Sequence, residues 1–163
     1  MQPVVGSRGG PRRRDLRFLR HRLRWHGRPR RRQVRERRFV VCTGGEPLLQ
    51  LDRAAVDALH ARGFRVAVET NGTIAPPPGL DWICVSPKAD TALAVRAGDE
   101  LKLVFPQAEA PPERFEALGF AHFFLQPMDG ARRDANTREA VAYCLAHPRW
   151  RLSLQAHKII GIR

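Results

Sequence analysis

The chain has 163 residues, a length that allows one domain with a real core and excludes two ordinary ones. Its three cysteines, Cys42, Cys84 and Cys144, lack metal-ligand spacing and are odd in number, which argues against a disulfide framework and predicts reduced core thiols. The sequence shows no apolar run of membrane-spanning length and no secretory signal, so we expect a cytoplasmic protein without a membrane partner.

The net charge of +13 lies in residues 1–38, which hold 15 Arg against two acids, while the remainder of the chain is neutral. The apolar residues of this segment follow no helical or strand period, so we expect residues 1–38 to be a disordered arm beside a domain formed by residues 39–163. The alternative function is therefore a non-catalytic protein whose arm binds nucleic acid. With only Phe18 and Trp25 for base stacking, we expect that binding to be non-specific.

From Phe39 onward, strand-like and helix-like segments alternate. The apolar run 39–42 predicts a buried strand, and the glycine turn 43–47 follows it, where Glu46 is expected to meet either a cationic partner or solvent. Asp52 predicts the start of a helix that runs to about Arg62 and ends at Gly63. Further strands are predicted at 64–69, 82–85, 101–105, 122–125 and 150–154, and further helices at 111–118 and from Asn136 or Thr137 to Ala146.

This alternation predicts an α/β fold with a parallel sheet, either open or forming a partial barrel. In both architectures, ligands bind at the carboxyl ends of the strands. Five predicted strands end in polar or charged groups, at 43–46, 69–71, 86–88, 126–129 and 155–158. Each group alone has an ordinary explanation as a turn or a surface charge, but together they predict one ligand pocket.

Six short stretches, in this order along residues 39–163, carry a resemblance to a known family: 43–50 (TGGEPLLQ), 69–73 (ETNGT), 85–88 (VSPK), 100–102 (ELK), 126–129 (QPMD) and 155–158 (QAHK). The chain resembles the 7-carboxy-7-deazaguanine synthases of the radical S-adenosylmethionine superfamily. The resemblance implies a partial barrel of the radical S-adenosylmethionine type. It also implies a carbon–nitrogen lyase of queuosine biosynthesis, a tRNA modification, that converts 6-carboxy-5,6,7,8-tetrahydropterin to 7-carboxy-7-deazaguanine with loss of ammonia.

The resemblance also implies the site residues. Thr43 and the chain end at Arg163 are expected to contact the substrate. The residues expected to bind S-adenosylmethionine are Gly45 and Glu46, at its amino group, and Ser86, Pro87, Lys88, Gln126, Pro127, Met128 and Asp129. These residue types suit the cofactor, which offers an ammonium, a carboxylate, ribose hydroxyls and a flat base. The family further implies a 4Fe-4S cluster, Mg²⁺, a flavodoxin-type reductant and a homodimer.

The sequence departs from the family in residues 1–38. The family holds its cluster through three cysteines in a loop that follows a first strand, because three thiolates bind three irons and leave the fourth open. Residues 1–38 contain no cysteine, and this chain lacks the first strand, the cluster loop and the threonine of that loop that binds Mg²⁺. We therefore assign no metal ligand and expect this chain to be inactive.

Residues 1–35 are consistent with translation in the wrong reading frame. Back-translated and read one base later, they yield three cysteines, an Asp-Thr-Asp-Phe run and a Gly-Gly-Gly-Lys run in order. For example, Met1 followed by Gln2 forces the bases ATG-CA, which contain a TGC cysteine codon in the shifted frame. We predict that the gene encodes these residues in the shifted frame and that the intact frame resumes just before Phe39. Sequencing the gene tests this, and a shifted frame without the cysteines would refute it.

Overall fold

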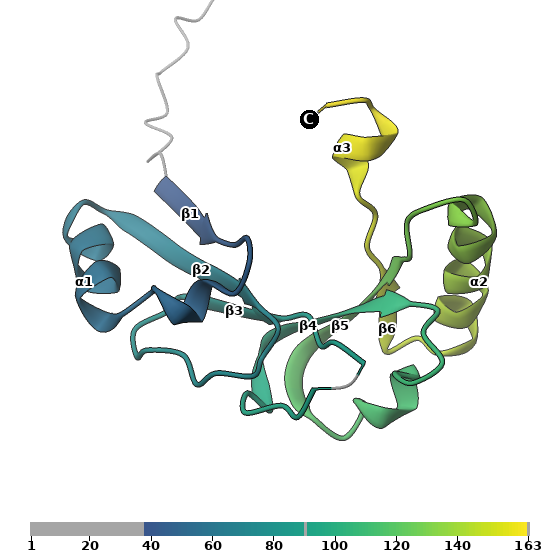
Figure 1. The fold of residues 1–163 in the computed structure, drawn as a ribbon, viewed down its shortest axis with the longest axis horizontal. Helices are drawn as coiled ribbons and strands as arrows, with labels where there is room; N and C mark the ends of the chain where they lie inside the picture. Colours follow the sequence, from purple (N-terminus) through teal and green to yellow (C-terminus); the bar gives the residue numbers. More distant parts are fainter. Residues whose placement is uncertain (1–37, 90, 163) are drawn as a thin grey trace, which may run out of the picture. The chain divides into compact units, whose positions relative to one another are not determined.

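A computed structural model describes residues 38–89 and 91–162. In this part of the chain, six strands form one sheet in sequence order, and each neighbouring pair is parallel (Figure 1). The strands are β1 (Arg38–Cys42), β2 (Phe64–Thr70), β3 (Trp82–Val85), β4 (Ala97–Phe105), β5 (Gly119–Pro127) and β6 (Trp150–Leu152). Since β1 and β6 do not pair with each other within the described residues, the sheet is open, and the predicted α/β fold with a parallel sheet is confirmed.

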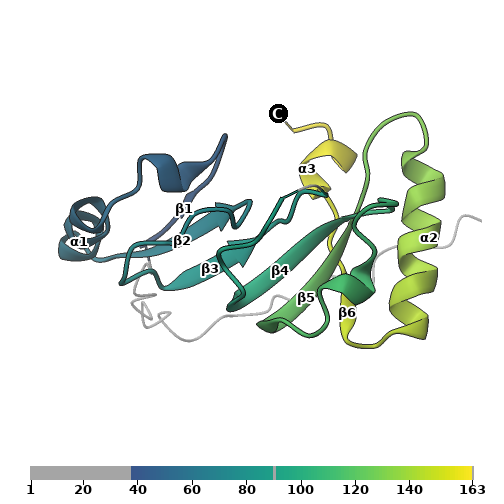
Figure 2. The same cartoon turned by 60° about the horizontal axis from the view of Figure 1, so that its bottom comes forward.

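Two longer helices accompany the sheet, with α1 (Arg53–Ala61) lying along β2 and α2 (Arg133–Ala146) along β5 and β6 (Figure 2). The short helix α3 (Ala156–Ile159) follows β6, and two single 3-10 turns, η1 (Pro47–Leu49) and η2 (Pro112–Arg114), lie in the connections. Within the described ranges, none of the helices has the length and apolar character that crossing a bilayer requires.

Helix α1 begins and ends where the sequence predicts. The Asp52 carboxylate accepts a hydrogen bond of 2.8 Å from the amide of Ala55, which satisfies a free donor of the first turn. Gly63 follows the helix with a φ of +79°, the left-handed conformation that terminates many helices. Between these ends, Val56 is completely buried against the sheet.

Several predicted boundaries are wrong. Strand β4 begins at Ala97 rather than at 101, and β5 runs from Gly119 to Pro127 rather than from 122 to 125. The helix expected at 111–118 is only η2, because Phe115 and Leu118 are drawn into the core just before β5 begins at Gly119. The last strand ends at Leu152, and the unpredicted α3 follows it. Helix α2 starts at Arg133, three residues before Asn136. Asn136 therefore lies inside the helix rather than at its N-cap, and its Nδ2 donates to the carbonyl of Met128 at 2.9 Å, which joins the helix to the end of β5.

The two faces of the sheet differ in chemistry because successive strand residues point to opposite sides. One face is the core, and five neighbouring residues in register there are each at most 2% exposed: Thr70, Val85, Leu101, Phe123 and Trp150. The preceding residues on β2 to β5 form a parallel row on the opposite face: Glu69, Cys84, Glu100 and His122. We call this second face, with its polar row, the inner face.

Strand β1 lies at one end of the sheet. Its predicted burial is wrong, because the side chains of Phe39 and Val41 are each 49% exposed on the inner face. Among the described residues β1 pairs only with β2, so one of its edges carries unpaired backbone groups. A strand edge that stays unpaired favours aggregation.

The turn after β2 requires a glycine at position 72. Gly72 has a φ of +80°, and a Cβ there would lie 2.7 Å from Val85 Cγ1 and 2.9 Å from Leu93 Cδ2. We expect Gly72→Ala to lower the free energy of unfolding by about 2–4 kcal/mol, because left-handed strain adds to overpacking. Gly63→Ala is the control, since its φ of +79° gives the same strain while no described atom lies within 4 Å. Urea denaturation should show the smaller loss for the control, and equal losses would contradict the steric argument.

Candidate functional site

All five predicted polar groups lie at the carboxyl edge of the sheet. Residues 43–46 follow β1, 69–71 end β2, 86–88 follow β3, 126–129 end β5 and 155–158 follow β6. Because the strands are parallel and neighbouring, these groups share one edge, as expected for a ligand site of this architecture. The predicted substrate contact Arg163 lies outside the described residues.

The carboxylate of Glu46 joins the glycine loop, residues 43–46, to the end of β2. Its Oε1 accepts from the hydroxyl of Thr70 at 2.6 Å and from the amide of Leu48 at 3.1 Å, and its Oε2 accepts from the amide of Asn71 at 2.8 Å. Among the described residues its partners are thus a hydroxyl and two backbone amides rather than a cationic side chain. The loop is fixed to β2 by its own acidic residue.

These hydrogen bonds set the ionisation of Glu46. Burial alone would raise its pKa, but the bonds from Thr70, Asn71 and Leu48 together outweigh burial, and the pKa lies below the ordinary value of 4.5. The carboxylate is therefore ionised at neutral pH, where it serves as a triple acceptor.

The glycine loop leaves its backbone accessible. Thr43, Gly44 and Gly45 are exposed, and the two glycines have φ values of +90° and +54°. A cavity of about 500 Å³ lies against the loop and the start of α1. With the Glu46 side chain engaged inside the protein, the loop offers a ligand mainly backbone groups and the Thr43 side chain.

The end of β3 is tied to the same arrangement. The amide of Ser86 donates to the carbonyl of Thr70 at 2.7 Å, and both Ser86 and Pro87 are buried. Lys88 is exposed one residue further on. Of the predicted contacts at this strand end, Lys88 therefore presents an accessible cation, whereas Ser86 and Pro87 shape the backbone.

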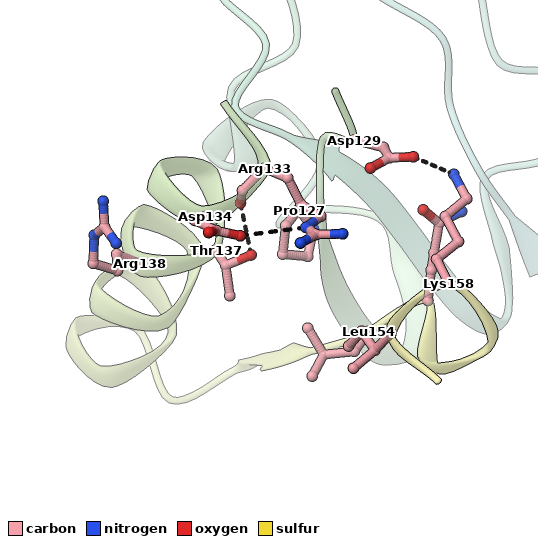
Figure 3. A pocket seen from close by; sticks show the side chains of 10 residues that line it. Pro127, Asp129, Arg133, Asp134, Thr137, Arg138, Leu154 and Lys158 are labelled. Atoms are coloured by element: carbon pink, nitrogen blue, oxygen red, sulfur yellow. Dashed lines mark hydrogen bonds and ion pairs between the residues drawn. The ribbon is translucent and has the colours of Figure 1, made fainter. Parts of the chain in front are cut away.

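The ends of β5 and β6 border a separate cavity of about 420 Å³ (Figure 3). Pro127 and Asp129 line it from the end of β5, and Leu154 and Lys158 line it from the segment after β6. Lys158 Nζ donates to Asp129 Oδ2 at 2.5 Å, and this bond is the main cause of a lowered Asp129 pKa. The ion pair thus fixes α3 to the end of β5.

The remaining predicted residues of β5 lie beside this cavity. Gln126 is half-buried, and Met128 is 37% exposed while its amide donates to the carbonyl of Phe105 at 2.7 Å. The structure therefore places Gly45 and Glu46 at the cavity beside the glycine loop, and buried Ser86 is linked to Glu46 through Thr70. Pro127 and Asp129 line the second cavity, further along the same edge, and Met128 lies between them in sequence.

An ion pair on the inner face was not predicted. Lys102 Nζ donates to Glu69 Oε1 at 2.6 Å, and Glu100 lies on the same face in register with Cys84. A cavity of about 470 Å³ opens there, with Trp82, Glu69 and Glu100 in its lining. The signal was present in the sequence, since Glu100 and Lys102 alternate with Leu101 and Leu103 in one strand, but the alternation does not say which charges meet.

The cysteines of this chain do not fit an iron–sulfur cluster. Cys42 ends β1, Cys84 lies in β3 and Cys144 lies in α2, and the described residues hold no group of three side chains placed to bind a metal. Burial, helped by the negative charge of Glu100, raises the pKa of the Cys84 thiol, so it stays protonated. Only Cys84 is a buried core thiol, whereas the other two are half-buried.

Glu46→Gln tests the carboxylate link. The new amide group would face the Asn71 donor, so we expect a loss of about 1–3 kcal/mol in the free energy of unfolding at neutral pH. A carboxylate with a lowered folded pKa stabilises the fold above its unfolded pKa and loses this contribution as the pH falls through the folded value. The difference in the free energy of unfolding between the unaltered chain and Glu46→Gln, which we call the gap, should therefore decrease as the pH falls below 4.5.

Denaturation curves at neutral pH and at one pH below 4.5 measure this gap, which is expected to be smaller at the acidic pH as Glu46 becomes protonated. Asp57→Asn is the matched control, because the Asp57 carboxylate is exposed and pairs only locally with Arg53 on α1. A gap for Glu46→Gln that is equal at both pH values would contradict the role of the ionised carboxylate.

No family model matches the chain, but curated proteins of one name do. The chain is 70% identical over 125 residues to the 7-carboxy-7-deazaguanine synthase of Caulobacter vibrioides, and this match covers 77% of the chain and 60% of the relative. It is 68% identical to the enzyme of the same name from Bordetella pertussis, with the same coverage.

A solved structure is also similar. The crystal structure of QueE from Escherichia coli superimposes with a TM-score of 0.59 at 31% identity, covering 72% of this chain and 56% of that chain. The chain therefore spans about 60% of the length of the curated relatives that it matches.

Proposed function

We infer that this chain belongs to the family of 7-carboxy-7-deazaguanine synthases and that it carries the S-adenosylmethionine-binding edge of such an enzyme. One observation carries this proposal: the glycine loop at the end of β1 is fixed to β2 through Glu46 and leaves its backbone free beside a cavity. A pre-formed loop with exposed amides and carbonyls suits the amino and carboxylate groups of the methionine moiety.

The proposed reaction of the complete enzyme is the conversion of 6-carboxy-5,6,7,8-tetrahydropterin to 7-carboxy-7-deazaguanine with loss of ammonia, in queuosine biosynthesis. Thr43 and the chain end at Arg163 are the proposed substrate contacts. Family membership also supports a homodimer, Mg²⁺ and a flavodoxin-type reductant for the complete enzyme. The chain's own residues bind and orient in this scheme, and the cluster supplies the reductive chemistry.

We further propose that this exact chain is inactive. Its three cysteines lie on three different elements, so no step of the reaction can be assigned through a cluster held by them. The residues proposed to bind S-adenosylmethionine, unlike the three cysteines, lie along one edge of the sheet. Binding without an anchoring iron is expected to be weak.

The Arg-rich residues 1–38 support a second candidate function. Their 15 Arg, against two acids, would bind polyanions with strong salt dependence. A nucleic-acid complex that is sequence-selective at physiological salt would favour this function over the first.

Binding of S-adenosylmethionine by the unaltered chain is the first test. We expect measurable but weak affinity by calorimetry, and we expect Lys88→Met to lower it about tenfold because an exposed cation near the cofactor carboxylate is removed. Arg62→Met is the control, since it removes an exposed cation at the end of α1 far from the glycine loop, where its side chain donates to the carbonyl of Ala58. Equal affinities for all three proteins would contradict the assignment of Lys88.

Anaerobic reconstitution with iron and sulfide is the second test. The unaltered chain should develop no cluster absorbance, whereas a version whose residues 1–35 are replaced by the shifted-frame reading should bind a cluster. A stoichiometric cluster in the unaltered chain would overturn the proposed inactivity.

A further inference from the structure

The ion pair between Lys102 and Glu69 crosses a strand. Glu69 lies in β2 and Lys102 in β4, and β3 runs between them. The register explains the geometry: Glu69 is level with Cys84, Cys84 is level with Glu100, and Lys102 lies two residues further along β4 on the same face. The Lys102 side chain therefore reaches over β3 to the end of β2.

The Lys102–Glu69 pair is partly shielded from solvent. The Lys102 side chain is 15% exposed and that of Glu69 is 35% exposed, in contrast to the Arg53–Asp57 pair on α1, whose side chains are more than half exposed. Without Lys102, Glu69 and Glu100 would share the inner face as like charges beside the buried Cys84. Removing one partner of such a pair is costly because the other charge stays uncompensated.

Glu69 is directly followed by the two residues that hold the glycine loop. The Thr70 hydroxyl and the Asn71 amide both donate to the Glu46 carboxylate, and the Thr70 carbonyl accepts from Ser86. Any movement of the Glu69 backbone therefore changes the position of Glu46. A chain of contacts runs from β4, over β3, to the loop beside the 500 Å³ cavity.

We propose that Lys102 is a positioning residue for the S-adenosylmethionine site, acting through Glu69 on the Thr70–Asn71 turn that holds Glu46. The proposal rests on the proposed function. It assigns a role to the sequence Glu100-Leu101-Lys102, which the resemblance marks without explaining. Lys102 does not line the cavity at the glycine loop, so its effect there is indirect.

Two measurements on the full chain test the proposal in three variants. Lys102→Met removes the charge at similar length, Lys102→Arg keeps it, and Arg62→Met removes an exposed cation whose hydrogen bond stays within α1. The first measurement is hydrogen exchange at the amides of Asn71 and Leu48, both of which donate to Glu46. The second is the calorimetric affinity for S-adenosylmethionine.

We expect Lys102→Met to speed exchange at both amides and to weaken binding about tenfold, the effect of losing roughly one well-placed contact. Lys102→Arg should restore most of the affinity, since guanidinium also pairs with a carboxylate. Arg62→Met should match the unaltered chain in both measurements. If Lys102→Met does not fold, the double variant Lys102→Met with Glu69→Gln removes both charges and takes its place.

Unchanged exchange and unchanged affinity in Lys102→Met would overturn the proposal. Faster exchange with unchanged affinity would also overturn it, because Lys102 would then support only the fold. If the unaltered chain binds no S-adenosylmethionine, the proposed function fails, and the exchange rates still decide whether Lys102 controls the Glu46 contacts.

Discussion

The carboxylate of Glu46 is the contact on which the candidate site depends. It accepts three hydrogen bonds, from Thr70, Asn71 and Leu48, and so fixes a glycine loop that has few other contacts to the end of the neighbouring strand. The two glycines give the loop a backbone that a ligand can approach, but they also give it conformational freedom. Without the carboxylate, that freedom would be lost only when a ligand binds, which would weaken binding.

The sheet supplies the support for this contact. Its covered face packs a continuous row of fully buried side chains from Thr70 to Trp150, so the strands cannot shift in register without moving that row. The inner face carries the complementary row, with Glu69, Cys84, Glu100 and Lys102 close together. Stability is thus concentrated on one face and charge on the other, and both meet at the carboxyl edge.

The chain corresponds to only part of its curated relatives. The chain spans about 60% of the length of its curated relatives, and the end of the sheet at β1 leaves Phe39 and Val41 half exposed. Its cysteines lie on separate elements, so the residues present suit binding and orientation rather than cluster chemistry.

The sequence alone determined the succession of strands and helices along the chain, the cap of α1 at Asp52 and the polar strand ends, because these follow from local periodicity and short-range hydrogen bonds. It could not determine that Glu46 meets Thr70, that Asn136 holds Met128, or that Lys102 meets Glu69, since 24, 8 and 33 residues separate these partners. Only the register of the parallel strands decides which of these distant groups face each other. A local pattern fixes which face a side chain takes, and the tertiary structure fixes its partner.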